Sequence, residues 1–283
     1  MRIDFYTFGG KSTWEDVFIY AQWRIQRHCN LKDYRLLDEF DIKRCSGTFA
    51  ECQKSFVEFI EAYETERQDP NIVIMLHGLN GSRHDFKKMW QAFKTDGIFA
   101  TAISYPSTKK RIDAQVRQFN VLLNNLSDTT HVSFIAKGTS GLILRKLLCA
   151  ANDVEWKKRI KIKRILEICP PNKGSKLFSH FRKNGLIRKL FGPMLDEGSE
   201  EASSFIPEFP KGIDLGIISC DSYYKKYAMF LPSKYKQLIP SQVENAIGGP
   251  YKSIYIQNKE KNPLENEKII LACKSFIKTG NFN

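Results

Sequence analysis

The segment Ala136-Lys-Gly-Thr-Ser-Gly141 contains residue types that could carry out acyl transfer. Its serine, Ser140, follows an apolar run at residues 132–136 and precedes a second apolar segment, which is typical of a strand that turns sharply into a helix. A serine hydroxyl becomes an effective nucleophile only when a base, usually an imidazole, takes its proton. The chain has five histidines, at positions 28, 77, 84, 131 and 180. A base for Ser140 would therefore have to come from His180 or an earlier position.

Alternating strands and helices must position these groups. A buried strand is predicted at residues 71–76, and His77-Gly78 follows it directly. Further strands are predicted at residues 98–105, 132–136 and 164–169, with amphipathic helices between them. Later strands are predicted at residues 214–220 and 253–257, before a final helix at residues 264–277. This order predicts a mostly parallel sheet flanked by helices, with right-handed crossovers.

The first 70 residues do not continue this alternation. Residues 14–24 and 49–66 place apolar side chains at helical spacing, which predicts two helices. We therefore expect residues 1–70 to form an N-terminal extension that packs on a main domain spanning residues 71–283. Length and composition agree with this size, because 283 residues with 42% apolar and 12% aromatic content are typical of a globular chain with a sizeable core.

The order of these motifs resembles the α/β-hydrolase superfamily, and in particular its bacterial lipase- and esterase-like subgroup. Residues 136–140 resemble the nucleophile elbow, Gly-x-Ser-x-Gly, which lies between a strand and a helix. His77-Gly78 occupies the place of the loop that supplies half of the oxyanion hole, and Pro170-Pro-Asn-Lys-Gly-Ser175 is similar to a segment that follows the elbow helix in this subgroup. The resemblance implies an α/β-hydrolase fold with a helical cap insertion at about residues 173–211.

The same resemblance implies that the catalytic triad is degenerate. The nucleophile position falls on Gly138, and the histidine position, before the final helix, falls near Glu260. The acid position falls near Gln237, and Asp221 is the alternative acid because it directly follows a predicted strand. The resemblance assigns four further residues to the oxyanion loop and pocket: His77, Gly78, Leu79 and Thr139.

Two interpretations of the elbow remain open at this point. Glycine at position 138 relieves the strained backbone of an elbow, which costs about 1–3 kcal/mol for other residues, so stability alone explains it. Alternatively, Ser140 has become the nucleophile. We favour the first interpretation, because Ser140 would lie in the first turn of the helix, where capping is the usual role of a serine.

The net charge of +13 suggests an anionic partner. The densest basic runs are at residues 157–164 and at Arg182-Lys183 with Arg188-Lys189. A lysine-rich solvated surface is the simpler explanation, and we do not expect nucleic acid as a partner because no nucleic-acid-binding motif accompanies the charge. An anionic membrane surface is the better of the two functional options.

The seven cysteines are scattered and contain no Cys-x-x-Cys pair, so we expect mostly buried, reduced thiols. The chain shows no metal-binding or nucleotide-binding motif, and we expect no metal and no other cofactor. The opening residues lack the apolar run of a signal peptide, and no segment approaches the length of a membrane span. These features favour the cytoplasm, with secretion by a signal-less route left open.

Three functions follow as expectations. The first is a pseudo-hydrolase that binds a small acyl or lipid-like ligand, or a protein partner, without turning it over. The second is an active serine hydrolase of acyl esters that uses Ser140. The third is attachment to an anionic membrane or to nucleic acid through the basic runs. Fold-level analogy does not decide between them.

Overall fold

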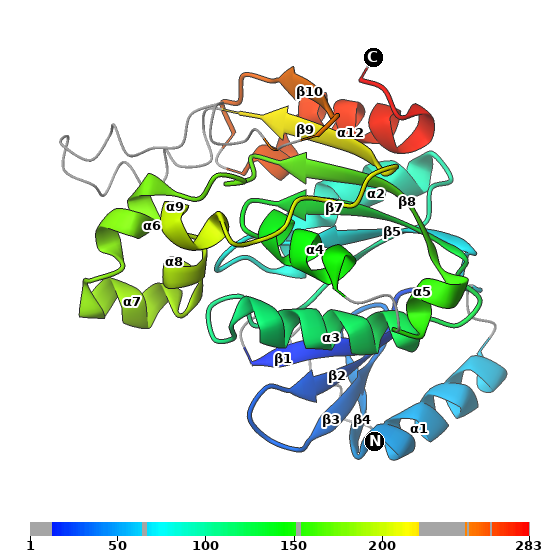
Figure 1. Ribbon diagram of the computed structural model, residues 1–283. Coiled ribbons are helices and arrows are strands. Elements are labelled where there is room, and N and C mark those ends of the chain that lie inside the picture. Colours follow the sequence, from blue (N-terminus) through cyan, green and yellow to red (C-terminus); the bar gives the residue numbers. More distant parts are fainter. Residues whose placement is uncertain are drawn as a thin grey trace.

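A six-stranded sheet forms the centre of the computed structural model, which describes residues 13–63, 67–150, 154–220, 247, 249–260 and 262–282 (Figure 1). Its strand order is β10-β9-β8-β7-β5-β6, and every neighbouring pair is parallel. The strands are β5 (Asn71–Leu76), β6 (Ala100–Ile103), β7 (His131–Lys137), β8 (Lys161–Ile168), β9 (Asp214–Ser219) and β10 (Lys252–Tyr255). The predicted parallel sheet is confirmed.

Helices cover both faces of this sheet, and the apolar side chains of β5 alternate between the two faces. Ile72, Ile74 and Leu76 of β5 pack on one face with α3 (Ile112–Asn124) and α4 (Ser140–Cys149). Val73 and Met75 pack on the other face with α2 (Lys87–Thr95) and α12 (Glu267–Thr279). Two short helical turns, η2 (Arg83–Phe86) and η4 (Pro263–Glu265), directly precede α2 and α12. A third, α5 (Trp156–Arg159), follows α4.

A second, antiparallel sheet lies in the N-terminal part. It has the order β1-β2-β3-β4, with β1 (Trp14–Tyr20), β2 (Trp23–His28), β3 (Tyr34–Leu37) and β4 (Lys43–Gly47). Helix α1 (Phe49–Ala62) begins at a capping box of Thr48 and Glu51 and packs Cys52 and Phe56 on this sheet. The helix predicted at residues 49–66 is therefore present as far as Ala62.

The helix predicted at residues 14–24 is wrong, because these residues form the β1–β2 hairpin. The interior of β1 is buried on both faces, so its apolar residues Val17, Phe18 and Ile19 are consecutive, and a run this short does not distinguish a strand from a buried helix. The turn lacks the usual glycine or asparagine: Ala21 adopts φ +49°, and its N–H donates to Gln68 Oε1 at 2.6 Å. A contact from a distant segment thus stabilises the turn.

The N-terminal sheet is joined to the six-stranded sheet by buried hydrogen bonds. The Asp16 N–H donates to the Ser104 carbonyl at 3.0 Å, and the Ser104 N–H donates to Asp16 Oδ2 at 2.6 Å. Gln118 Nε2, from α3, donates to the Asp16 carbonyl at 3.0 Å. Strand β1 therefore lies against the end of β6 and against α3, below the main sheet in Figure 1.

Four short helices form the insertion after β8: α6 (Lys176–Phe181), α7 (Gly185–Phe191), α8 (Met194–Glu197) and α9 (Glu200–Ser203). They project to one side of the sheet in Figure 1, in the place where a cap was predicted. Arg145 of α4 holds the end of this insertion, because its guanidinium donates to the carbonyls of Ile206, Pro207 and Asn172 at 2.6–2.9 Å.

The basic run at residues 157–164 has a structural use. Lys157 donates to the Leu148 and Ala150 carbonyls at the end of α4. Arg159 donates to carbonyls at the end of α3, and Arg164 donates to the Ile277 carbonyl near the end of α12. Cations stabilise the C-terminal ends of helices, where carbonyls are unpaired and the dipole is negative.

Within the described ranges, no helix is long and apolar enough to cross a membrane.

Candidate functional site

The predicted elbow is present between β7 and α4. Strand β7 ends at Lys137, Gly138 adopts φ +59°, and α4 begins at Ser140. The Gly138 N–H donates to the Ile168 carbonyl of β8 at 2.9 Å, and the Gly138 carbonyl accepts from the Gly141 N–H at 3.2 Å. The turn therefore has the strand–turn–helix form of a nucleophile elbow, with a glycine at its apex in the left-handed region that glycine adopts without strain.

The oxyanion-side loop begins where β5 ends. The His77 ring is buried and stacks on the Tyr105 ring, with centroids 4.1 Å apart, and the Tyr105 hydroxyl donates to the His77 carbonyl. Gly78 and Gly81 close a turn through a 3.0 Å hydrogen bond, and Leu79 packs into the core. His77 thus supports the loop by packing. Burial raises the pKa of Tyr105, so its hydroxyl stays protonated.

Ser140 is fully buried, and its hydroxyl donates to the Lys137 carbonyl at 3.0 Å and to the Leu76 carbonyl at 3.1 Å. It therefore ties the elbow to the end of β5. None of the hydrogen bonds in the described part of the chain joins Ser140 to a histidine, and the adjacent Thr139 is likewise buried. Both hydrogen bonds direct the Ser140 hydroxyl to carbonyls inside the protein, and this geometry gives no support to Ser140 as a substitute nucleophile.

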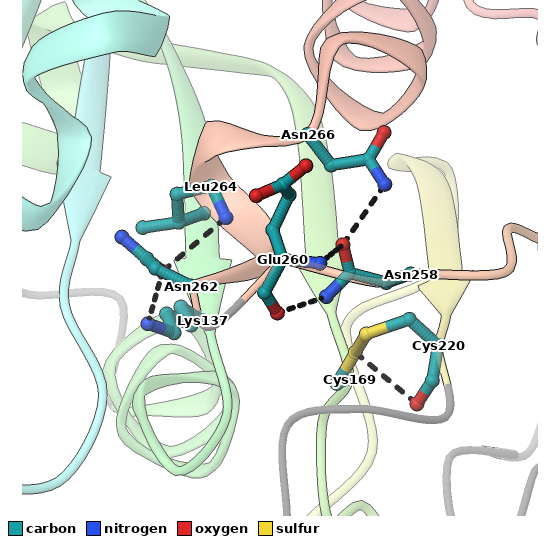
Figure 2. The surroundings of a disulfide bond; sticks show 8 residues. All are labelled: Lys137, Cys169, Cys220, Asn258, Glu260, Asn262, Leu264 and Asn266. Atoms are coloured by element: carbon teal, nitrogen blue, oxygen red, sulfur yellow. Dashed lines mark hydrogen bonds between the residues drawn. A yellow bond between two sulfur atoms is a disulfide. The ribbon is translucent and has the colours of Figure 1, made fainter. Parts of the chain in front are cut away.

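An asparagine network occupies the loop after β10, where the resemblance implies a histidine (Figure 2). Asn258 receives a hydrogen bond from the Glu260 N–H at 3.2 Å and donates to the Glu260 carbonyl at 3.0 Å. Asn266 Nδ2 donates to Asn258 Oδ1 at 2.9 Å. The exposed Glu260 side chain lines a surface hollow beside η2 and α2. The backbone N–H and carbonyl of Glu260 both take part in this network.

Asn262 makes the contact between this loop and the elbow. Lys137 Nζ donates to Asn262 Oδ1 at 2.8 Å, and Asn262 Nδ2 donates to the Asp85 carbonyl at 3.1 Å. Sequence reasoning missed Lys137, Asn258, Asn262 and Asn266. The four-residue spacing of the three asparagines before the final helix was the available signal, since Asn262 and Asn266 also cap η4 and α12.

The other four histidines lie on other elements. His131 begins β7, at the opposite end of that strand, and His28 ends β2. His180 lies in α6 of the insertion, and His84 Nε2 is 3.2 Å from Asp41 Oδ2. The predicted acid positions, Gln237 and Asp221, lie outside the described residues. The described residues thus bring together the elbow and the oxyanion loop without a nucleophile–base pair.

A buried carboxyl group lies behind the elbow helix. Glu167 of β8 is fully buried, and Asn172 Nδ2 donates to its Oε2 at 2.7 Å. Burial raises its pKa to about 7. Glu167 fits closely against the first turn of α4, because a Cβ built on Gly141 would lie 2.2 Å from Glu167 Oε1. A side chain at position 141 would therefore displace the Glu167 carboxyl group, and sequence reasoning missed Glu167.

A disulfide joins the ends of two neighbouring strands. Cys169 follows β8 and Cys220 follows β9, and their Cα atoms are 6.0 Å apart (Figure 2). The expectation of reduced thiols is therefore wrong for this pair, because parallel strands end side by side and bring the two residues together. Five cysteines are free: Cys29, Cys45, Cys52, Cys149 and Cys273. In the described ranges, no group of three or more histidine, cysteine and carboxylate side chains could hold a metal ion.

Comparison with known proteins identifies the fold. No model of a protein family matches the sequence, and no curated protein matches it. The mature lipase BlEst2 of Bacillus licheniformis superposes with a TM-score of 0.57 at 14% identity, covering 77% of this chain and 96% of the lipase. An esterase of Thermogutta terrifontis gives a TM-score of 0.46 at 10% identity, covering 74% and 90% of the two chains. The similarity to the lipase therefore shows that the chain has an α/β-hydrolase fold.

Proposed function

We propose that this protein is a pseudo-hydrolase, which binds an acyl or lipid-like ligand on a lipase-type scaffold without hydrolysing it. One observation carries the proposal: Gly138, at φ +59°, occupies the apex of the elbow and has no side chain to attack an ester. The asparagine network after β10 agrees with this proposal. Near the position that the resemblance implies for the base, Asn258 and Asn266 carry amide side chains, which do not exchange protons near neutral pH.

Exposed apolar side chains on the insertion support an apolar ligand. Leu186 and Leu190 of α7 are 81% and 63% exposed, and Phe205 after α9 is 83% exposed. Ile187 and Phe191 of the same helix pack on the core, so α7 offers its other face to a partner. Large exposed apolar side chains on one element mark interaction surfaces more often than chance positions do. A protein partner on the same surface is the second form of this proposal.

The test of inactivity is hydrolysis of a p-nitrophenyl acyl ester series of increasing chain length. We expect background rates for the wild type, for Gly138→Ser and for Ser140→Ala. Ser133→Ala is the matched control for loss of fold, because it changes a different buried serine, which lies in β7. Turnover that disappears in Ser140→Ala and persists in Ser133→Ala would establish the rival function, an active serine ester hydrolase.

The test of ligand binding uses a fluorescent fatty acid, cis-parinaric acid, displaced by oleate. We expect saturable binding to the wild type that weakens by roughly tenfold in Leu186→Ser combined with Leu190→Ser, about 1.4 kcal/mol. Leu271→Ser is the matched control, because Leu271 is 59% exposed on α12. Equal affinity of the double variant and the control for the fatty acid would show that the ligand does not bind at α7. Absence of fatty-acid binding would favour a protein partner at this surface.

Membrane attachment through the basic run has weaker support. Lys157, Arg159 and Arg164 already donate to helix carbonyls, and Lys158 pairs with Glu155 at 2.7 Å. Lys161 and Lys163 are exposed and could therefore contact an anionic surface. Sedimentation with phosphatidylserine vesicles should therefore be weak, and Lys161→Ala with Lys163→Ala should abolish whatever binding occurs.

We also propose a cytoplasmic location, which the five free cysteines support. The Cys169–Cys220 bond favours an oxidising compartment instead. Alkylation of thiols before cell lysis, followed by mass spectrometry, distinguishes the cytoplasm from an oxidising compartment. Modified Cys169 and Cys220 would agree with the cytoplasm, and an intact bond would place the protein in an oxidising compartment.

A further inference from the structure

Two of the free cysteines, Cys45 and Cys52, lie on packed elements of the N-terminal part. Cys45 belongs to β4, the edge strand of the antiparallel sheet, and Cys52 is the fourth residue of α1. Thr48 alone separates β4 from α1, so the helix folds back onto the sheet directly after the strand (Figure 1). The fold therefore brings the start of the helix and the edge strand together.

The register of the sheet shows which face Cys45 occupies. Cys45 lies opposite Leu36 in the β3–β4 ladder, and residues directly opposite each other in an antiparallel pair share one face. Leu36 is fully buried in the apolar cluster that α1 completes with Cys52 and Phe56. Cys45 packs against the same cluster. The Cys45 side chain is therefore on the face of the sheet that α1 covers, beside Cys52.

The two thiols interact but differ in their access to solvent. Burial raises the pKa of Cys52 to about 12, and the neighbouring Cys45 thiol contributes to this rise through its charge and a hydrogen bond. Side chains have such an effect on each other only at short range, within about 4–6 Å. Cys52 is fully buried, whereas Cys45 is partly exposed. A reagent in solution therefore reaches Cys45 first, with the second thiol held behind it.

We propose that Cys45 and Cys52 form a redox-active dithiol, which a small disulfide such as glutathione disulfide converts into an intramolecular disulfide bond. A structural zinc site takes four ligands, and no group of three or more suitable side chains is present in the described part of the chain. Two adjacent thiols, one of them accessible, are instead the arrangement that thiol–disulfide exchange requires.

The exchange takes place in two steps. The Cys45 thiolate attacks one sulfur of glutathione disulfide, the bond between the two glutathione sulfurs breaks, and one glutathione thiolate leaves. The Cys52 thiolate then attacks the Cys45 sulfur of this mixed disulfide and displaces the second glutathione thiolate. The two thiol protons pass through solvent to the two released thiolates. One dithiol is thus oxidised while one glutathione disulfide is reduced to two molecules of glutathione.

The burial of Cys52 makes its reaction depend on Cys45. Cys52 has no exposed surface, so it does not meet glutathione disulfide directly. Its raised pKa leaves little thiolate near neutral pH, so the second step should be slower than the first. The new bond would tie the start of α1 to β4. The elbow follows β7, outside this N-terminal sheet, so the inference does not depend on the proposed function.

The test is incubation of the folded, full-length protein with glutathione disulfide, followed by alkylation of the remaining thiols, trypsin digestion and mass spectrometry. Arg44 and Lys54 flank the pair, so trypsin releases residues 45–54 as one peptide that contains both thiols. We expect this peptide first to gain one glutathione on Cys45. It should then lose the glutathione and end two hydrogen atoms lighter than the reduced peptide, without alkylation.

Single variants separate the two steps. Cys52→Ser should keep glutathione on Cys45, because the displacing thiol is absent. Cys45→Ser should leave Cys52 without glutathione and open to alkylation only after unfolding. Cys29→Ser, which removes a free thiol from β2's neighbouring turn, is the matched control and should behave as the wild type. Circular dichroism checks the fold of each variant.

Three results would overturn the proposal. The first is wild-type protein that retains glutathione on Cys45 as persistently as Cys52→Ser does. The second is a wild-type peptide with both thiols still open to alkylation after the incubation. The third is glutathione on Cys52 in the folded Cys45→Ser variant, which would show that Cys52 reacts without its neighbour.

Discussion

Lys137 and Asn262 join the elbow to the loop after β10 through a hydrogen bond of 2.8 Å between Nζ and Oδ1. Lys137 directly precedes Gly138 and is 7% exposed, so its charge is held largely away from solvent. Asn262 also bonds the Asp85 carbonyl beside η2. The two residues therefore connect three loops at the carboxyl edge of the sheet, and this edge is held by polar contacts that do not include a nucleophile–base pair.

Removing this connection should loosen the edge and lower stability. We expect Asn262→Ala to reduce the free energy of unfolding by about 1–3 kcal/mol, because it removes one acceptor from Lys137 Nζ and one donor from the Asp85 carbonyl. Urea denaturation measures the loss. Lys259→Ala, at an exposed position of the same loop, is the control and should change stability by less than about 0.5 kcal/mol. Equal values for the two variants would contradict a structural role for the contact.

Serine at position 138 should be strained and inactive. Gly138→Ser places a side chain at φ +59°, which we expect to cost about 1–3 kcal/mol in unfolding free energy. Gly97→Ser is the matched control: Gly97 has φ +67°, and a Cβ there meets no atom within 4 Å. Both variants should lose similar stability, and neither should hydrolyse esters. Substantial hydrolysis by Gly138→Ser would reveal a base near the elbow.

Glu167 should make stability depend on pH. Its pKa rises from 4.5 to about 7 on folding, so folding favours the protonated carboxyl. The resulting stability is complete below pH 4.5 and is lost as the pH rises through 7, a change of about 3 kcal/mol at most. Glu167→Gln should flatten this part of the pH profile in urea denaturation. Glu61→Gln, at an exposed position, should leave the profile unchanged.

Reduction of the Cys169–Cys220 bond should destabilise the fold. The bond closes a loop with a sequence separation of 51 residues, and the entropy of such a loop corresponds to about 4 kcal/mol as an upper value. We expect a reducing agent to lower the urea midpoint of the wild type and to have no effect on Cys169→Ser combined with Cys220→Ser. Cys29→Ser, which removes a free thiol, should respond as the wild type does. A wild-type midpoint that does not move on reduction would exclude a stabilising bond.

The sequence by itself determined the parallel sheet and the elbow. Regular apolar runs at β5, β7 and β8, each followed by small residues and an amphipathic segment, specify local structure through contacts between near neighbours. Glycine at position 138 also follows from the local backbone, because the turn requires a positive φ. These features depend on few residues close in the chain, and they were predicted correctly.

Only the tertiary structure decided the N-terminal hairpin, the polar loop contacts and the buried charges. Residues 14–24 fit both a helix and a strand, and the choice depends on burial on both faces and on Gln68, which is 47 residues from Ala21. Lys137 and Asn262 are 125 residues apart, and Asp41 and Arg83 are 42 apart. Hydrogen bonds and ion pairs between such distant residues leave no periodic signal in the sequence, because one pair of side chains is enough to form each contact.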